Sequence, residues 1–415
     1  MTMQDHVLTL NAGSSSLKFA LFALSDLHAG VDGAPVFLGL AQSLGQATAR
    51  LDMQGPGDQR HSMPLALPVP SGSAQSAHSA ALEGILQCLA VHVRNAQVVA
   101  VGHRIVHGGA TLDAPRRVDD ALIAELQELS SLAPLHQAHN LAGVQAARLA
   151  FPDVPQVACF DTAFHRSQPE LNQRYALPQE LFDQGIRRYG FHGLSYESIA
   201  DQLRQVRPEL ARPEARVVVA HLGNGASLCA MRGLRSVATT MGFSPLDGLP
   251  MGTRCGRLDA AVVLHLLTQG RSAGDITDLL YRQSGLLGLS GASSDVRNLS
   301  QSDSDSARMA LAYFAEHARR EIAGMAAALQ GMDALVFTGG IGENAHVLRG
   351  QIVQGLNWMG CAMDESRNRQ PDFSAEGGAL ISASGSRVPV YVMATNEEAV
   401  IARHTWRTVL AHTET

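Results

Sequence analysis

The chain opens with two short apolar runs, at 7–10 and 17–22, that flank a small polar loop at 11–16. Runs of this length, bounded by glycine and serine, predict strands rather than helices. The pattern therefore predicts a strand, a Gly/Ser loop and a returning strand. A second unit of this kind lies near the middle of the chain, where the apolar runs 217–222 and 227–231 flank a Gly-rich loop. We interpret the pair as an internal duplication with one Gly-rich hairpin in each half.

Helical periodicity marks two other segments. In 119–132, leucines recur at intervals of three and four residues, which predicts an amphipathic helix. The Ala-rich stretch 307–330 predicts a long helix that ends at Gly331.

Further strands and helices complete an alternating pattern. Buried strands are predicted at 156–160 and 334–338. The chain closes with a helix in which Thr395 and Glu398 have the spacing of a capping box. We interpret 54–80, which is rich in Gly, Pro, Ser and Gln, as mostly loop. Because strands and helices alternate, the sequence predicts an α/β fold.

Length and composition limit the class of protein. A chain of 415 residues is long enough for two or three domains, and 46% hydrophobic with 17% charged residues is typical of globular proteins, not of disordered or fibrous ones. The net charge of −6 argues against nucleic acid as a partner. No apolar run approaches the roughly 20 residues of a membrane span, and the N-terminus does not resemble a signal peptide. We therefore expect no membrane partner and a cytoplasmic location.

Cysteine and lysine usage adds two observations. The 5 cysteines have no CxxC spacing, so neither a disulfide framework nor a zinc site is indicated, and we expect reduced thiols. Among the 32 basic residues, Lys18 is the single lysine. Since an ammonium and a guanidinium bind phosphate differently, Lys18 is a candidate functional residue.

Gly-rich loops that follow strands can bind anions, because small residues let backbone N–H groups approach phosphate oxygens. The loops 11–16, 223–226 and 339–344 are all of this kind. One such loop alone is more often a tight turn, but their spread over both halves indicates a nucleotide held between two domains. None of them matches the P-loop pattern GxxxxGK(S/T).

Three charged or titratable residues lie in Gly-flanked segments. They are Arg104 in GHRIVHGG, Arg254 in MGTRCGR and His192 in RRYGFHG. Each alone has a structural alternative, an internal ion pair for the arginines and a core position for the histidine. Together they favour a cluster around a phosphoryl group.

The chain resembles the acetate kinase family in a series of motifs that occur in the same order from Asn11 to Arg403: NAGSSSLKF, GHRIVHGG, FDTAFH, RRYGFHG, HLGNGAS, MGTR, SGASSDVR, FTGGIGEN and TNEEAVIAR. The resemblance implies the two-domain sugar kinase–actin–Hsp70 (ribonuclease H-like) fold, with duplicated mixed five-stranded sheets and an interdomain cleft. It implies an N-terminal acyl- and phosphate-side domain at 1–161 plus 395–415, a C-terminal nucleotide-binding domain at 162–394, and a homodimer.

The reaction implied by the resemblance is reversible transfer of the γ-phosphoryl group of ATP to acetate, giving ADP and acetyl phosphate, with Mg²⁺ or Mn²⁺. Propionate kinase activity stays open, because one methylene in an apolar pocket is worth only about 1–3 kcal/mol. A non-catalytic or chaperone-like ATP-binding module also stays open, although it would not need Arg104, Arg254 and His192 together. A sugar kinase is disfavoured because a hydroxyl nucleophile needs a base.

The resemblance also implies roles for individual residues. It assigns catalysis to Arg104, Asp161, His192 and Arg254, and a magnesium site to Asn11 and Glu397. The residues it assigns to the carboxylate substrate and its methyl pocket are Arg104, Val106, Leu135 and Pro245. The residues it assigns to the nucleotide and its phosphates are Ser14, Ser16, Lys18, His221, Leu222, Gly223, Asn224, Gly225, Asp295, Val296, Arg297, Gly340, Ile341, Gly342, Glu343 and Asn344.

Physical chemistry is compatible with these roles. A carboxylic acid is already ionised at neutral pH, so the nucleophile needs no base. It does need charge cancellation, because two unit negative charges 4 Å apart repel by about 4 kcal/mol at an effective dielectric constant of 20. We therefore expect Asp161 to orient a cation, and direct transfer rather than a phospho-Asp161 intermediate. Glu398 has a helix-capping role in the predicted box, which leaves Glu397 as the metal ligand.

Two segments depart from the family pattern. Gln137-Ala138-His139 replaces Asn-Pro-Pro, and we expect the loss of both prolines to loosen a turn beside the acyl pocket. Arg257 replaces an acidic residue three positions after Arg254. We expect Arg257 to point to solvent, with recruitment of another anion as the alternative.

Overall fold

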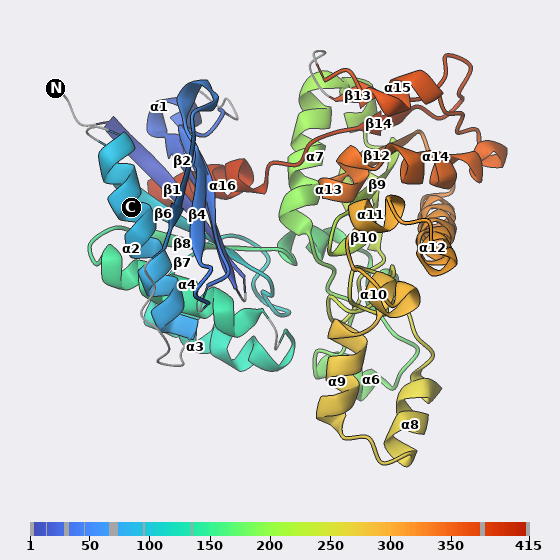
Figure 1. Ribbon diagram of the computed structural model, residues 1–415, viewed down its shortest axis with the longest axis horizontal. Helices are drawn as coiled ribbons and strands as arrows, with labels where there is room; N and C mark the ends of the chain where they lie inside the picture. Colours follow the sequence, from blue (N-terminus) through green and yellow to red (C-terminus); the bar gives the residue numbers. More distant parts are fainter. Residues whose placement is uncertain are drawn as a thin grey trace. The chain divides into compact units, whose positions relative to one another are not determined.

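The structure is a computed structural model that describes residues 4–13, 15–28, 33–44, 46–65, 74–93, 96–133, 136–373 and 378–411. The chain forms two compact units (Figure 1). Unit 1 comprises Met1–Ala163 and Asn396–Thr415, and unit 2 comprises Phe164–Thr395. None of the described helices combines the length and the apolar character that crossing a bilayer requires.

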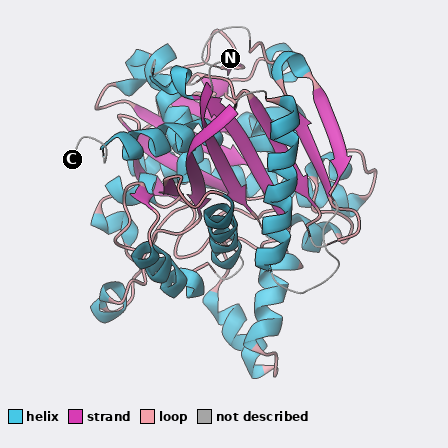
Figure 2. Cartoon of the chain, turned by 90° about the vertical axis from the view of Figure 1, so that its left-hand side faces the viewer, coloured by secondary structure: helices cyan, strands magenta, loops and turns pink. Residues whose placement is uncertain are grey.

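Unit 1 is built on an eight-stranded sheet in the order β5-β4-β3-β2-β1-β6-β8-β7 (Figure 2). Its strands are β1 (Gln4–Ala12), β2 (Ser16–Ala23), β3 (Phe37–Gln42), β4 (Arg50–Gln54), β5 (Arg60–Pro64), β6 (Ala96–Ile105), β7 (Arg116–Arg117) and β8 (Gln156–Phe160). Its helices are α1 (Leu24–His28), α2 (Ala74–His92), α3 (Asp120–Glu128), α4 (Gln137–Ala150) and α16 (Glu397–Ala411).

Alternate residues of one strand reach opposite faces of this sheet. In β1, Leu8 packs with the residues of α2 and α4, whereas Val7 packs with Ala402 of α16. Gly102 of β6 lets α16 approach closely, because a Cβ at this position would overlap Thr405. The C-terminal helix therefore covers one face of a sheet that begins at the N-terminus.

Unit 2 is built on a six-stranded sheet in the order β11-β10-β9-β12-β14-β13. Its strands are β9 (Arg216–Leu222), β10 (Ala226–Arg232), β11 (Arg235–Thr239), β12 (Ala334–Thr338), β13 (Ala379–Leu380) and β14 (Val390–Val392). Its helices are α5 (Glu170–Gln173), α6 (Gln179–Asp183), α7 (Gly193–Val206), α8 (Ala260–Thr268), α9 (Ala273–Arg282), α10 (Gly285–Ser290), α11 (Val296–Ser300), α12 (Asp305–Leu329), α13 (Gly339–Asn344), α14 (His346–Gln354) and α15 (Glu365–Arg369).

Two helices cover the faces of this second sheet. Ile199 and Leu203 of α7 pack against Val217 and Val219 of β9. The long helix α12 packs against β9, β10 and β11, and Figure 1 shows α7 and α12 on opposite sides of the sheet. The predicted long helix is confirmed as α12, whose last residue is Leu329; the left-handed residue Gln330 caps it and precedes Gly331.

The predicted duplication is confirmed by the strand pairing. In unit 1, the order β3-β2-β1-β6-β8 has two antiparallel pairs followed by two parallel pairs. In unit 2, the order β11-β10-β9-β12-β14 repeats this pattern. The predicted α/β class and the two Gly-rich hairpins are confirmed with it.

Some details of the prediction are wrong. Each sheet extends beyond five strands, with β4, β5 and β7 added in unit 1 and β13 in unit 2. The segment 54–80 is not mostly loop among its described residues, because it contains β5 and the start of α2. The Gly-rich segment after β12 forms the short helix α13 rather than a loop.

The predicted capping box at the start of α16 is also wrong. The helix begins at Glu397, and the side chain of Asn396 accepts the backbone N–H of Ala399 at 3.0 Å. Asn396 therefore caps α16. This leaves Glu398 available for another role.

Candidate active site

One cluster of polar side chains lies at the carboxyl edge of the sheet in unit 1. β1, β6 and β8 run parallel and are neighbours, so they end at the same edge. Asn11 is the penultimate residue of β1, Arg104 is the penultimate residue of β6, and Asp161 follows β8 directly. Glu397, the first residue of α16, reaches the same edge.

Arg104 is the centre of this cluster. Its Nη2 lies 2.6 Å from Asp161 Oδ2, and its Nε donates to the two carboxylate oxygens at 3.2 and 3.1 Å. Its Nη1 donates to Asn11 Oδ1 at 3.2 Å, and its Nε lies 3.8 Å from Glu397 Oε2. The structure thus brings together residues that are 93 positions apart in the sequence.

Burial and charge act in opposite directions in this cluster. Burial tends to lower the pKa of the Arg104 guanidinium, but the charges of Asp161 and Glu397 outweigh it and the pKa is raised. Burial raises the pKa of the Asp161 carboxyl, and Arg104 opposes this rise. Both oxygens of Asp161 accept hydrogen bonds from the guanidinium, which is the geometry of an ionised carboxylate in a two-pronged ion pair.

The single lysine has a carboxylate partner. Lys18 Nζ lies 2.6 Å from Glu398 Oε1, and the Glu398 side chain is only 10% exposed. Glu397 and Glu398 therefore have different partners, Arg104 and Lys18, although they are adjacent on α16.

Val106, a predicted pocket residue, is held by a buried asparagine that the sequence analysis missed. The N–H of Val106 donates to Asn140 Oδ1 at 2.9 Å, and Asn140 Nδ2 donates to the carbonyl of Ala12 at 2.7 Å. Asn140 thereby ties the residue after β6 to the last residue of β1. Leu135, the other predicted pocket residue of unit 1, lies outside the described residues.

The loop between β1 and β2 is a tight turn. The N–H of Gly13 donates to the carbonyl of Ser16, the first residue of β2, at 2.8 Å. Ser14 lies outside the described residues.

The segment that replaces the family's prolines is not a loosened turn. α4 begins at Gln137, which is completely buried. The Nε2 of Gln137 donates to the carbonyls of His107 and Leu126, at 3.3 and 3.2 Å. The residues in place of the prolines can therefore form the first turn of the helix, with Gln137 bound to two neighbouring segments.

In unit 2, His192 and Arg254 converge on one glycine. His192 is the left-handed residue, with φ 59°, that precedes α7. A Cβ on Gly225, in the loop between β9 and β10, would lie 3.1 Å from His192 Nε2 and 3.7 Å from Arg254 Nη1. The two side-chain nitrogens therefore approach the same point of the loop. Glycine leaves this point open, because any other side chain would fill it.

Neighbouring groups orient both side chains. The ring of His192 stacks on His221 of β9, with centroids 4.2 Å apart, and its Nδ1 lies 2.9 Å from Ser227 Oγ. Arg254 Nη1 donates to the carbonyl of Pro245 at 2.9 Å. Contacts thus join the predicted residue His192 to His221, and Arg254 to Pro245.

Arg257 does not simply point to solvent, which differs from expectation. Its Nη1 lies 2.8 Å from Glu321 Oε1 on α12. Glu321 therefore neutralises the second cation of the MGTRCGR segment. The turn itself depends on Gly256, whose φ of +71° and contact with the backbone of Leu249 exclude a side chain.

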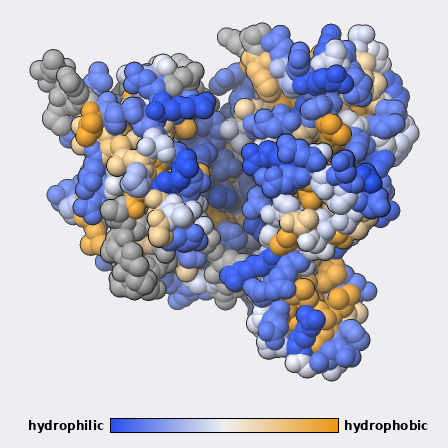
Figure 3. All heavy atoms as spheres, viewed as in Figure 1, coloured by the Kyte–Doolittle hydropathy of each residue, from blue (hydrophilic) through white to orange (hydrophobic). Residues whose placement is uncertain are grey.

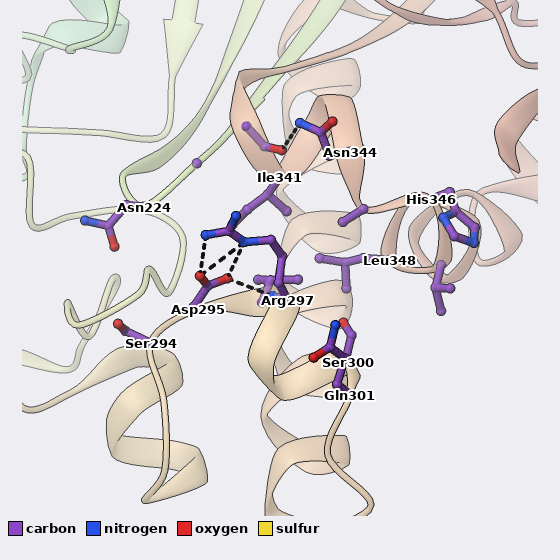
Figure 4. Close-up of a pocket in the computed structure, with 15 residues that line it drawn as sticks. Asn224, Ser294, Asp295, Arg297, Ser300, Gln301, Ile341, Asn344, His346 and Leu348 are labelled. Carbon is purple, nitrogen blue, oxygen red and sulfur yellow. Dashed lines mark hydrogen bonds and ion pairs between the residues drawn. The ribbon is translucent and has the colours of Figure 1, made fainter. Parts of the chain in front are cut away.

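A cavity of about 880 Å³ lies beside these loops in unit 2 (Figure 4). The predicted nucleotide residues that line it are Gly223, Asn224, Asp295, Val296, Arg297, Gly340, Ile341 and Asn344. It has the size of a small-ligand site and mixes apolar with polar groups. Figure 4 shows that the carboxylate of Asp295 holds the guanidinium of Arg297 at its wall, with Nη2 and Oδ2 2.7 Å apart.

Other predicted nucleotide residues of unit 2 do not line this cavity. They are His221, Leu222, Gly225, Gly342 and Glu343. Glu343 Oε1 instead accepts the N–H groups of Gly339, at 3.0 Å, and of Thr395, at 3.3 Å. Its contacts connect the start of α13 with the segment after β14.

A family model described as the Acetokinase family matches residues 6–403. The chain belongs to this family. The match covers both units, including the clusters around Arg104 and around His192.

Individual members of the acetokinase family are similar over their whole length. The chain is 48% identical over 406 residues to the acetate kinase of Methylocella silvestris, which covers 97% of this chain and 98% of that one. A propionate kinase from Francisella tularensis has a similar structure, with TM-score 0.85, 34% identity and coverage of 98% and 100%. The acetate kinase of Porphyromonas gingivalis matches with TM-score 0.83, 33% identity and coverage of 98% and 100%.

The cluster around Arg104 fits a magnesium ion. Asp161 and Glu397 both face the single guanidinium of Arg104, so these three groups carry one uncompensated negative charge. Carboxylate and amide oxygens, such as that of Asn11, are ligands that Mg²⁺ prefers. The described residues contain no group of three or more His, Cys, Asp or Glu side chains arranged around a metal, which is compatible with Mg²⁺ because this ion keeps several waters and binds substrate phosphates.

Several residues at the site were missed by the sequence analysis. Besides Asn140, they are Ser227 and Tyr196, which stand behind His192, and His346, which lines the cavity. One signal was available, because Ser227 directly follows the Gly-rich loop within a strand otherwise rich in apolar residues.

Proposed function

We propose that the chain transfers the γ-phosphoryl group of ATP to acetate, giving acetyl phosphate and ADP. The observation that carries the proposal is the convergence of His192 Nε2 and Arg254 Nη1 on Gly225, beside the cavity of unit 2. Two donors that face one point of a Gly-rich loop suit the oxygens of a transferred phosphoryl group. Family membership supports the same reaction.

In this proposal, each unit supplies the residues for one of the two substrates. Unit 1 supplies the acceptor side through Arg104 and Val106, and unit 2 supplies the nucleotide side through the cavity and the loop that carries Gly225. An oxygen of acetate forms a bond to the γ-phosphorus, and the bond from phosphorus to the bridging oxygen breaks. ADP leaves with that electron pair, and no proton has to move because acetate is already ionised.

Asn11 and Glu397 would hold Mg²⁺, which supplies positive charge against the phosphate oxygens when bound. Arg104 binds the acetate carboxylate and offsets its repulsion from the phosphoryl oxygens. Asp161 orients Arg104, since both of its oxygens are already engaged by the guanidinium. This arrangement supports direct transfer rather than a phospho-Asp161 intermediate.

Trapping the product with hydroxylamine tests the reaction class. The enzyme is supplied with ATP, Mg²⁺ and acetate, propionate or butyrate, and the hydroxamate is measured. We expect hydroxamate from acetate with the highest kcat/KM. A higher kcat/KM for propionate would identify a propionate kinase, and no hydroxamate from any acid would refute phosphoryl transfer to carboxylates.

We also propose that two copies of the chain associate through α8. This helix has no buried residue, and Val262, Leu264 and Leu267 are all exposed on it. Figure 3 shows a hydrophobic patch over the lobe that contains this helix. The covering partner that fits is a second copy, because the family resemblance implies a homodimer and an exposed apolar surface of this kind is typical of subunit contacts.

Light scattering tests this association. We expect the wild-type chain to have the mass of a dimer and Leu264→Glu that of a monomer. Leu171→Glu, at a leucine on α5 that is also exposed, is the matched control and should leave the mass unchanged. A dimer in Leu264→Glu would exclude α8 as the contact.

We propose the cytoplasm as the location. ATP is the phosphoryl donor, and Cys88, Cys229, Cys255 and Cys361 carry thiols that form no disulfide. Free thiols fit a reducing compartment.

A further inference from the structure

A buried chain of hydroxyl groups stands behind His192. Nδ1 of His192 lies 2.9 Å from Ser227 Oγ, and Ser227 Oγ lies 2.5 Å from the hydroxyl of Tyr196. Ser227 and Tyr196 are completely buried, on β10 and α7 respectively. A strand of the unit 2 sheet and the helix that packs on this sheet therefore meet at the imidazole through side-chain oxygens.

The hydrogens of this chain can be assigned by counting donors. Burial raises the pKa of the Tyr196 hydroxyl well above its usual value, so it keeps its proton. Among the described residues, Ser227 Oγ is the hydrogen-bond partner of this hydroxyl, and the distance alone allows either oxygen to donate. If Tyr196 donates to Ser227, the hydroxyl proton of Ser227 is available to His192 Nδ1. The opposite direction would leave a buried tyrosine O–H without an acceptor, which is unfavourable.

An imidazole that accepts at Nδ1 carries its hydrogen on Nε2. Nε2 is the ring atom nearest to the Cβ position of Gly225, a point that Arg254 Nη1 also approaches. We propose that Tyr196 and Ser227 are positioning residues, which hold His192 as the Nε2–H tautomer so that it donates to the phosphoryl oxygens without becoming charged. This inference rests on the proposed function, in which His192 contacts the transferred group.

The other groups that face His192 agree with a neutral ring. His221 of β9 stacks on it at 4.2 Å, with its own Nδ1 held 2.8 Å from Ser195 Oγ of α7. Arg254, from the turn before α8, adds a fixed positive charge on the Nε2 side. A second positive charge on His192 would be repelled by Arg254, whereas a neutral N–H donor would not. Arg254 then supplies the charge and His192 a directed hydrogen bond.

Three variants test the chain, and kcat, the KM values and urea unfolding are measured for each. Tyr196→Phe removes one hydroxyl and should lower kcat about 3–10-fold, the equivalent of one net hydrogen bond. Ser227→Ala should lower kcat at least as much and destabilise the protein, because it leaves the Tyr196 hydroxyl buried without an acceptor. In the double variant the unpaired hydroxyl is gone, so stability should recover while kcat stays low.

The KM values and a control variant separate a positioning role from general damage to the folded protein. We expect the KM values for ATP and acetate to stay within about twofold of wild type, because the cavity and Arg104 are untouched. Tyr189→Phe is the matched control: it also removes a buried tyrosine hydroxyl, one that donates to the carbonyl of Gly185 at 2.7 Å. It should leave kcat unchanged.

Nitrogen-15 NMR of labelled histidine gives a second readout, with the His192 signals assigned from a His192→Gln spectrum. We expect the Nε2–H tautomer in wild type and a mixture of tautomers in Ser227→Ala. An Nδ1–H ring or an imidazolium in wild type at neutral pH would overturn the inference, as would unchanged kcat in Tyr196→Phe and Ser227→Ala.

His192→Gln also distinguishes a failure of the proposed function from a failure of the positioning role. Loss of one transition-state donor typically costs about 100–1,000-fold in kcat. If His192→Gln keeps wild-type kcat, the proposed function has the wrong residue. If it loses activity while Tyr196→Phe and Ser227→Ala do not, only the positioning role is wrong.

Discussion

Replacing Arg104 with glutamine should destabilise unit 1 by an amount that depends on pH. The Asp161 side chain is 1% exposed, and the substitution removes the guanidinium that holds both of its oxygens. Leaving a buried charge without its partner typically costs about 3–5 kcal/mol. The protein can limit this cost by protonating Asp161 in the folded state.

Protonation sets an upper bound on the loss. A carboxyl with a reference pKa of about 3.9 is protonated at pH 7 at a cost of about 4 kcal/mol, and at pH 5 at a cost of about 1.5 kcal/mol. In the variant the folded state binds this proton more tightly than the unfolded chain, so the destabilisation shrinks as the pH falls. We expect a loss of about 3–4 kcal/mol at pH 7 and no more than about 1.5 kcal/mol at pH 5.

Urea unfolding at the two pH values measures the effect. Trp406 on α16 reports on unit 1, and a Trp358→Phe background removes the other tryptophan, which is exposed in unit 2. The double variant Arg104→Gln/Asp161→Asn should regain most of the stability, because no buried charge remains, and still form no hydroxamate. Arg148→Gln, whose partner Asp120 is largely exposed, is the control and should change stability by less than about 0.5 kcal/mol.

The same loss at pH 7 and pH 5 would show that Asp161 is not an uncompensated charge in the variant, and the reasoning about the ion pair would be wrong. Hydroxamate formation at the wild-type rate in Arg104→Gln would refute the acetate-binding role of Arg104.

Three further predictions concern other parts of the chain. Lys18→Arg should lower kcat about tenfold or more, because Glu398 holds a compact ammonium at 2.6 Å and a forked guanidinium places its charge differently; kcat from hydroxamate assays checks this, and unimpaired turnover would contradict it. Arg257→Ala should change the free energy of unfolding by less than about 1 kcal/mol, since its side chain is 60% exposed, and a larger change in urea unfolding would give its ion pair a structural role. Burial lowers the pKa of His103 and His165 to about 4, so below about pH 6.5 the unfolded chain binds protons that the folded chain does not, and stability should fall between pH 6.5 and 4. Urea unfolding over this range, with His103→Gln flattening the slope, tests the last prediction.

The sequence predicted best what depends on local periodicity and glycine. The hairpins 7–22 and 217–231 and the helix at 307–330 follow from short apolar runs, Gly-rich turns and the 3.6-residue period. The cluster around Arg104 was implied by the family resemblance and not by a local pattern, because the three parallel strands that bring its residues to one edge of the sheet pair only after folding.

What the sequence did not predict depends on tertiary partners. β4 was missed because Leu51 and Met53 alternate with polar residues over only one short strand in a stretch rich in Gly, Pro and Ser. The helical spacing of Glu398 suggested a cap, whereas its partner Lys18 is remote in the sequence and adjacent only after folding. The alignment of Tyr196 with Ser227 likewise requires the packing of α7 on β10, which no local pattern encodes.

The chain order of unit 1 has a consequence for biosynthesis. Its sheet precedes unit 2 in the sequence, but the helix that covers one face of that sheet and carries Glu397 and Glu398 follows unit 2 and is made later. Until then Val7, Phe22 and Ala100 lack the residues of α16 against which they pack. The whole of unit 2 is synthesised within this interval and can fold first. A truncated chain that ends before residue 396 would therefore combine an exposed apolar surface with a proposed acceptor site that lacks both glutamates. Synthesis of α16, after the whole of unit 2, is thus the step that assembles this unit.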